Sequence, residues 1–197
     1  MKIVKKILLF CIVIITFFLT EDLNVFAEGK PPEEGGNLPL IKLPVPESEV
    51  EKAYLGLKGK GSFTIPQIEA DVVIIEIFSM YCPYCQKEAP IVNDLYNAIE
   101  QNTDIKGKFK IIGIGAGNTP FEVEVFRKKF QIPFPLFSDA DFSIHKLCGE
   151  VRTPYFIVVK INKDGTHKVI YSRLGSIQDP NQFLELIFTL SGLKKEA

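Results

Sequence analysis

The sequence has little excess charge of either sign, because 23 lysines and arginines are balanced by 24 aspartates and glutamates, for a formal net charge of -1. Without a broad basic field to hold phosphates, nucleic acid is not expected as a partner. The chain also lacks an internal repeat. Its 46% hydrophobic and 24% charged residues are close to globular averages, which excludes wholesale disorder and collagen-like repeats.

The sequence also lacks an apolar run long enough to cross a membrane. The run Ile7–Leu19 holds thirteen residues, against roughly 18 or more in a spanning helix. Lysines precede this run, and the small residue Ala27 ends the more polar stretch after it. This pattern predicts a signal peptide over residues 1–27 and export to the periplasm or the extracytoplasmic face of the membrane. An uncleaved N-terminal anchor is the alternative.

Proline and glycine are concentrated in one stretch after this leader. Residues 28–46 contain five prolines and three glycines, which predicts an extended linker between the site of export and a folded domain. The remaining residues, 47–197, have the length of one ordinary domain.

The hydrophobic pattern alternates between short apolar runs and segments of helical period. The apolar runs predict strands over Phe63–Ile68, Asp71–Phe78, Phe109–Ile114, Tyr155–Ile161 and His167–Tyr171. Helical spacing and caps predict helices over Glu47–Leu57, Ala89–Ile99, Phe121–Phe130, Asp141–Leu147 and from Asp179 to Leu190. Because two strands are apolar on both parities, the sheet should be covered on both faces. An α/β fold with a mixed sheet follows.

Cysteine is scarce, and the leader removes one of the four. Three remain, an odd number that excludes a fully paired intramolecular framework. The motif Cys82-Pro83-Tyr84-Cys85 follows the strand expected over Asp71–Phe78 and stands at the start of a helix. There, backbone N–H groups and the helix dipole favour a thiolate at Cys82, which becomes the nucleophile. Cys85 then attacks the mixed disulfide and releases the reduced partner.

Three further residues are candidates with open roles. Glu76 is the only ionisable residue inside its apolar strand, beyond Asp71 at the start, so either its pKa rises and it accepts the Cys85 proton, or it faces a polar gap or edge. Glu88, one turn beyond Cys85, can tune the thiol pair, contact a partner or be a solvated helix residue. Cys148 is either a buried small apolar residue or a third redox thiol.

These residues resemble the thioredoxin superfamily over about Ser62 to Leu190. Pro90 corresponds to the proline that kinks the active-site helix of the family, and Thr153-Pro154 matches its cis-proline loop. Glu76 occupies the position of the buried acid of thioredoxin. The pattern Cys82-x-x-Cys85-x-x-Glu88-x-Pro90 further resembles the exported, membrane-tethered thiol-disulfide oxidoreductases of the TlpA and ResA type. That group carries an extra helix and strand, which Phe121–Phe137 can supply.

The resemblance implies a thioredoxin-like three-layer sandwich, with a mixed central β-sheet and helices on both faces. It implies exchange of disulfides with client proteins that carry cysteine pairs. In this reading Cys82 attacks, Cys85 resolves, and Glu76 shuttles a proton. Thr153 and Pro154 hold the substrate chain through backbone hydrogen bonds.

The resemblance also sets expectations for partners and specificity. It implies a reductase supplied by a membrane electron donor, with no organic cofactor and no metal. Tyr84 would contribute to an apolar rim for a protein substrate. One departure concerns Tyr81, which stands where the family usually has tryptophan before the first cysteine. This departure bears on the redox potential and the partner more than on the fold.

Three alternative functions remain open. A thiol peroxidase of the peroxiredoxin group is one, because Ser79-x-x-Cys82 fits its motif, although the proline of that motif would fall at Ile75. A non-catalytic module is another, in which the cysteine pair holds copper or zinc and His145-x-x-Cys148 completes a zinc set. The third reverses the electron flow, so that the protein oxidises folding clients.

Overall fold

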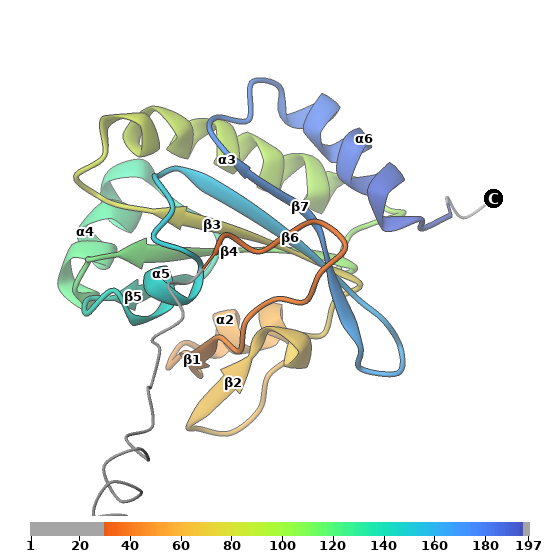
Figure 1. The fold of residues 1–197 in the computed structure, drawn as a ribbon, viewed down its shortest axis with the longest axis horizontal. Helices are drawn as coiled ribbons and strands as arrows, with labels where there is room; N and C mark the ends of the chain where they lie inside the picture. The colour runs from red at the N-terminus through yellow and green to blue at the C-terminus, as the bar shows by residue number, and fades with distance from the viewer. Residues whose placement is uncertain (1–29, 195–197) are drawn as a thin grey trace, which may run out of the picture.

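A five-stranded sheet forms the centre of the computed structural model, which describes residues 30–194 (Figure 1). The strand order is β5-β4-β3-β6-β7. Strand β3 (Val72–Phe78) lies in the middle, parallel to β4 (Phe109–Ala116) and antiparallel to β6 (Tyr155–Ile161). Strand β5 (Leu136–Asp139) pairs parallel with β4, and β7 (His167–Leu174) pairs antiparallel with β6. The predicted mixed sheet is confirmed.

Two different layers cover the sheet. Helices α3 (Pro83–Gln101), α4 (Pro120–Phe130) and α6 (Pro180–Ser191) contribute side chains to the apolar core on one face. On the other face lie α2 (Glu49–Leu55) and α5 (Ser143–Leu147). Figure 1 shows α3 and α6 on one side of the sheet and α2 on the other. The chain therefore has the three-layer thioredoxin-like architecture.

Strand β3 explains why the sheet needs two cores. All seven of its residues are buried, and successive side chains point to opposite faces. Val73, Ile75 and Ile77 join the core on the α2 side, whereas Val72 and Ile74 join the core under α3. Burying one such side chain contributes about 1.5–3 kcal/mol.

Local sequence signals set the ends of the helices. Thr119 and Glu122 form a capping box at the start of α4, in which each side chain accepts a hydrogen bond from the backbone N–H of the other. Asp179 caps α6 and accepts hydrogen bonds from Asn181 N and Gln182 N. The start of the last helix at Asp179 agrees with the prediction.

Residues 30–46 correct the predicted linker. Leu38, Ile41 and Leu43 are buried in the core on the α2 side. Strand β1 (Lys42–Pro44) pairs antiparallel with β2 (Ser62–Thr64) in a separate two-stranded sheet. The prolines suggested an extended linker, but the apolar residues between them supply a face that packs on the domain. The predicted signal peptide, residues 1–27, lies outside the described residues.

Two smaller differences concern strands. The strand expected over Phe63–Ile68 stops at Thr64, and a 3-10 helix (Ile65–Gln67) with Pro66 inside it takes over. Strand β2 therefore pairs with β1 and stays outside the main sheet. Strand β7 is three residues longer than the predicted His167–Tyr171 and ends at Leu174.

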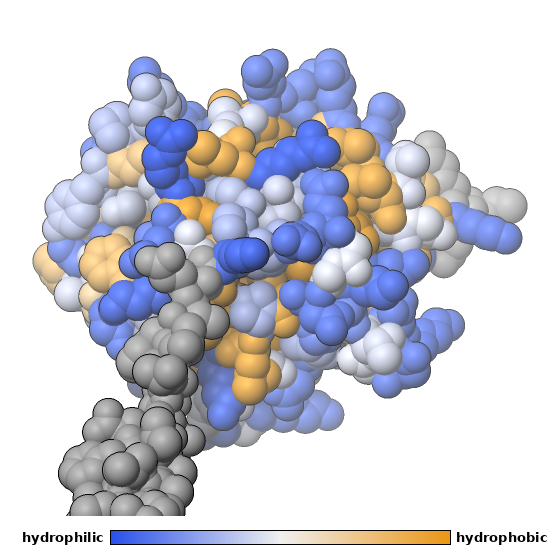
Figure 2. Space-filling view, in the orientation of Figure 1, coloured by the Kyte–Doolittle hydropathy of each residue, from blue (hydrophilic) through white to orange (hydrophobic). Residues whose placement is uncertain are grey.

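The surface is mixed in polarity. Figure 2 shows hydrophobic patches separated by hydrophilic residues on the face turned to the viewer, as is ordinary for a folded domain. No helix among residues 30–194 combines the length and the hydropathy needed to cross a membrane.

Candidate active site

The segment between β3 and α3 presents the cysteine motif. Cys82 is the N-cap residue of α3, with φ -81° and ψ 115°, and Cys85 lies in the first helical turn. The backbone of Met80 is held on both sides, because its N–H donates to Asn118 Oδ1 at 2.8 Å and its carbonyl accepts from Gln86 Nε2 at 2.8 Å. These contacts fix the approach of the chain to Cys82.

The two sulfurs have different environments. Both are free thiols, with Cys82 partly exposed and Cys85 buried. Burial raises the pKa of Cys82, but hydrogen bonding from the Thr153 side chain, from Cys85 and from the Tyr84 backbone outweighs it, so the pKa is lowered. Burial raises the pKa of Cys85 above the ordinary thiol range, and the charge of Glu76 adds to this effect. The accessible sulfur is therefore the one that ionises more readily.

The loop before β6 lies against the thiol pair. The Thr153–Pro154 peptide bond is cis, as the resemblance implies. The Cys82 thiol donates a hydrogen bond to the Thr153 carbonyl at 3.3 Å, across 71 positions of sequence. The Thr153 side chain also opposes the rise in the pKa of Cys85. The fold thus brings the two predicted motifs into direct contact.

Glu76 is buried in the sheet beneath this site. Its side chain is 3% exposed, and its Oε1 atom has no hydrogen-bond partner among the described residues. Burial raises the pKa of Glu76 to about 8, and the charges of Glu88 and Cys82 add to the shift. A carboxyl group with this pKa can take up or release a proton near neutral pH.

Glu88 is buried as well, although it lies on a helix. One carboxylate oxygen accepts a hydrogen bond from Ile177 N at 2.6 Å, and the other accepts from the Ser176 hydroxyl. Burial raises the pKa of Glu88, while these two hydrogen bonds oppose the shift. Glu88 therefore ties α3 to the segment after β7.

A cavity of about 470 Å³ opens beside the cis-proline loop. Four predicted site residues line it together. These are Tyr84, Glu88, Thr153 and Pro154. Its remaining walls come from α3, from the residue before Thr153 and from the end of β7. They are Lys87, Ile91, Arg152, Leu174, Gly175 and Ser176.

A second hollow of about 420 Å³ lies on the other side of Thr153. Tyr81, Phe142 and His145 contribute to its walls, and Arg152 lines both hollows. The Tyr81 hydroxyl donates to a Glu122 carboxylate oxygen at the start of α4. Tyr81, which replaces the tryptophan usual in the thioredoxin superfamily, is therefore held at the rim of the site.

A family model described as the AhpC/TSA family matches residues 41–171, which is more than half of the chain. The chain belongs to the AhpC/TSA family. The match includes the cysteine motif, Glu76, Glu88 and the Thr153–Pro154 loop.

Curated relatives and solved structures resemble this AhpC/TSA family member. The thiol-disulfide oxidoreductase ResA of Bacillus thuringiensis subsp. konkukian is 29% identical over 109 residues, or 55% of this chain and 58% of the relative. The chain thus matches less than two thirds of that relative's length. ResA of Halalkalibacterium halodurans is 24% identical over 72% of this chain and 76% of the relative.

Among solved structures, the thioredoxin domain of a thiol-disulfide oxidoreductase from Bacteroides vulgatus has a TM-score of 0.55. It is 18% identical and covers 79% of this chain and 98% of that structure. At this level of identity the similarity supports the thioredoxin-like fold.

Some residues that line the cavity were not predicted from the sequence. Arg152 adjoins the recognised Thr153-Pro154 motif, so its position in the chain was a usable signal. Leu174 and Ser176 had no such signal, because the pairing of β6 with β7 brings them to the site.

Cys148 and His145 do not join the thiol pair in a metal site. Cys148 is fully buried, and burial raises its pKa to about 12, with the charge of Asp139 adding to the shift. His145 Nε2 lies 2.7 Å from the Val151 carbonyl oxygen. Within residues 30–194, no group of three or more His, Cys, Asp or Glu side chains is placed to hold a metal ion.

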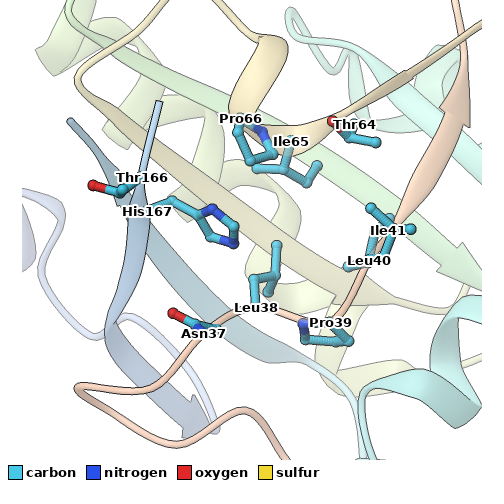
Figure 3. Close-up of a pocket in the computed structure, with 10 residues that line it drawn as sticks. All are labelled: Asn37, Leu38, Pro39, Leu40, Ile41, Thr64, Ile65, Pro66, Thr166 and His167. Carbon is cyan, nitrogen blue, oxygen red and sulfur yellow. The ribbon is translucent and has the colours of Figure 1, made fainter. Parts of the chain in front are cut away.

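Another hollow of about 440 Å³ lies away from the thiols (Figure 3). Residues 37–41, the 3-10 helix region and the start of β7 line it, and Figure 3 labels His167 among them. The active-site cavity includes Leu174, at the opposite end of β7. The two hollows are therefore separate.

Proposed function

We propose that this protein is an exported thiol-disulfide oxidoreductase that reduces disulfides of client proteins through Cys82 and Cys85. The observation that supports this proposal is the asymmetry of the pair. Cys82 is accessible and has a lowered pKa, whereas Cys85 is buried and has a raised pKa. One sulfur is thus suited to attack and the other to resolve.

In the first step, the Cys82 thiolate attacks one sulfur of a client disulfide. The client S–S bond breaks, a bond forms between Cys82 Sγ and that client sulfur, and the departing client sulfur takes up a proton. Thr153 and Pro154 hold the client backbone beside the sulfur, and Tyr84 contributes to the rim of the cavity.

In the second step, Glu76 accepts the proton of Cys85. The Cys85 thiolate attacks Cys82 Sγ, which breaks the bond to the client and leaves a Cys82–Cys85 disulfide. The second client sulfur departs as a thiolate and takes up a proton. Two electrons have then passed from the pair to the client. A dithiol electron donor at the membrane returns two electrons to the pair, and no organic cofactor or metal takes part.

The test is to trap the intermediate. In Cys85→Ala the second step is lost, so mixed disulfides between Cys82 and client proteins should accumulate and should disappear on reduction. Cys148→Ala is the matched control, because it removes the other buried thiol and should trap nothing. Absence of covalent adducts in Cys85→Ala would refute the exchange mechanism.

Two measurements separate the alternatives. Titration against glutathione or dithiothreitol should show a two-electron transition nearer the roughly -270 mV of thioredoxin than the roughly -120 mV of the oxidant DsbA. A potential near the oxidant would reverse the electron flow. Rapid peroxide consumption that survives Cys85→Ser would instead indicate a thiol peroxidase.

A further inference from the structure

Two exposed cations stand at the active-site cavity. Lys87 projects from α3 two residues beyond Cys85, and Arg152 directly precedes Thr153. Neither side chain forms an ion pair within residues 30–194. Arg173, by contrast, pairs with Glu34 at 3.2 Å. The positive charges at the cavity are therefore available to a ligand.

Among residues 30–194, Glu88 is the one acidic residue that lines the cavity, and its carboxylate already accepts two hydrogen bonds. Glu88 is 1% exposed, and its two oxygens accept hydrogen bonds from Ser176 and Ile177. It therefore gives Lys87 and Arg152 no exposed counter-charge. The accessible charge around the cavity is positive.

The other walls of the cavity are largely apolar. Ile91 and Pro154 line it, and Leu174 contributes a side chain that is 48% exposed. Tyr84 is 70% exposed on the same cavity. A surface of this kind complements an apolar side chain flanked by negative charge.

We propose that the cavity selects client segments in which an apolar residue and aspartate or glutamate lie beside the disulfide-bonded cysteine. Lys87 and Arg152 contact the carboxylates, and the apolar walls receive the neighbouring side chain. Arg152 directly precedes Thr153, whose carbonyl accepts the Cys82 hydrogen bond, so it joins the cavity to the loop that contacts the thiol. This assignment rests on the proposed thiol-disulfide exchange and adds its substrate class.

The experiment compares two disulfide-bonded peptides with the same apolar sequence. One carries aspartates beside the cysteine and the other carries lysines at the same positions. The second-order rate constant with the reduced full chain is divided by that of the same peptide with dithiothreitol, which removes differences in intrinsic disulfide reactivity. The acidic peptide should react roughly fivefold faster at low salt, because opposite charges speed encounter. The preference should shrink at high ionic strength.

Charge reversal provides the decisive variant. In the double variant K87E/R152E the acidic preference should disappear or invert. The control K58E/K60E makes the same change in net charge on exposed lysines of the turn after α2, which do not line the cavity, and should keep the preference.

The outcomes distinguish the two proposals. Equal normalised rates for the two peptides at low salt, or a preference that survives K87E/R152E, would overturn the client selection and leave the exchange function standing. If the wild-type chain exchanges disulfides with neither peptide nor dithiothreitol, both proposals fail.

Discussion

The two ends of β7 carry hollows of similar size and different content. The hollow at the Leu174 end holds about 470 Å³, and the one at the His167 end about 440 Å³. Eight residues of extended strand separate them by roughly 25 Å. Both are partly apolar, but the first is lined by the loop that contacts the Cys82 thiol, by the buried Glu88 and by Lys87 and Arg152. Placement of reactive groups, more than cavity size, therefore distinguishes the candidate active site.

The largest expected contrast between these ends comes from one substitution in each. Cys82→Ala removes the nucleophile, so dithiol-dependent reduction of insulin should fall to the uncatalysed background. Ile65→Ala in the Figure 3 hollow removes a fully buried side chain and should lower the free energy of unfolding by about 2–5 kcal/mol. Its folded fraction should reduce insulin at the wild-type rate. Similar loss of activity in both variants would break the comparison.

Glu76→Gln should slow the second step of exchange. The wild-type rate of mixed-disulfide resolution should rise as the pH passes about 8, where the Glu76 carboxylate forms. The Gln variant has no proton acceptor at this position and should lose that rise. Stopped-flow measurement of resolution from pH 6 to 9 checks this, and identical profiles would remove Glu76 from the mechanism.

The same substitution should change stability in a pH-dependent way. Unfolded Glu76 ionises near its ordinary value, whereas the folded carboxyl keeps its proton until about pH 8. The stability contributed by the protonated group is therefore lost progressively as the pH rises between these two values. Glutamine stays neutral, so the variant does not suffer this loss. The unfolding free energy of Glu76→Gln minus that of the wild type should therefore be up to roughly 3 kcal/mol larger at pH 7 than at pH 4. Urea denaturation at both pH values measures this.

A smaller effect is expected at Glu88, which ties α3 to the segment after β7. In Glu88→Gln the side-chain oxygen can still accept from Ile177 N. The NH2 group then replaces the oxygen that accepts from the Ser176 hydroxyl, so that hydrogen bond is lost. The loss of this contact should lower the unfolding free energy by about 1–3 kcal/mol. The KM for clients should rise more than kcat falls. An unchanged KM would show that the segment after β7 does not shape the client site.

Much of this site was predictable because its signals are local. The run Asp71–Phe78 is apolar on both parities, which indicated a strand buried on both faces. Cys82 and Cys85 follow it at the start of a helix. These two patterns depend only on neighbouring residues, whereas the role of Thr153-Pro154 was implied by the resemblance to the thioredoxin superfamily.

The features that were missed depend on distant contacts. Burial of Glu88 requires Ser176 and Ile177, which are more than eighty positions away, and no helical period reveals this. The proline-rich segment hid the apolar residues Leu38 and Ile41, because composition suggested a linker while the side chains pack on the sheet. Such contacts can be predicted only when the three-dimensional arrangement of the strands and loops is known.

The proline-rich segment also contacts the edge strand of the main sheet. Strand β7 is the last in the strand order, so within the described part of the chain one side of its backbone has no neighbouring strand. Gly35 N donates to the Val169 carbonyl at 2.7 Å, and Val169 N donates to the Gly36 carbonyl at 3.0 Å. These bonds occupy a place where another polypeptide could otherwise add in β-conformation, and so they guard the domain against edge-to-edge aggregation.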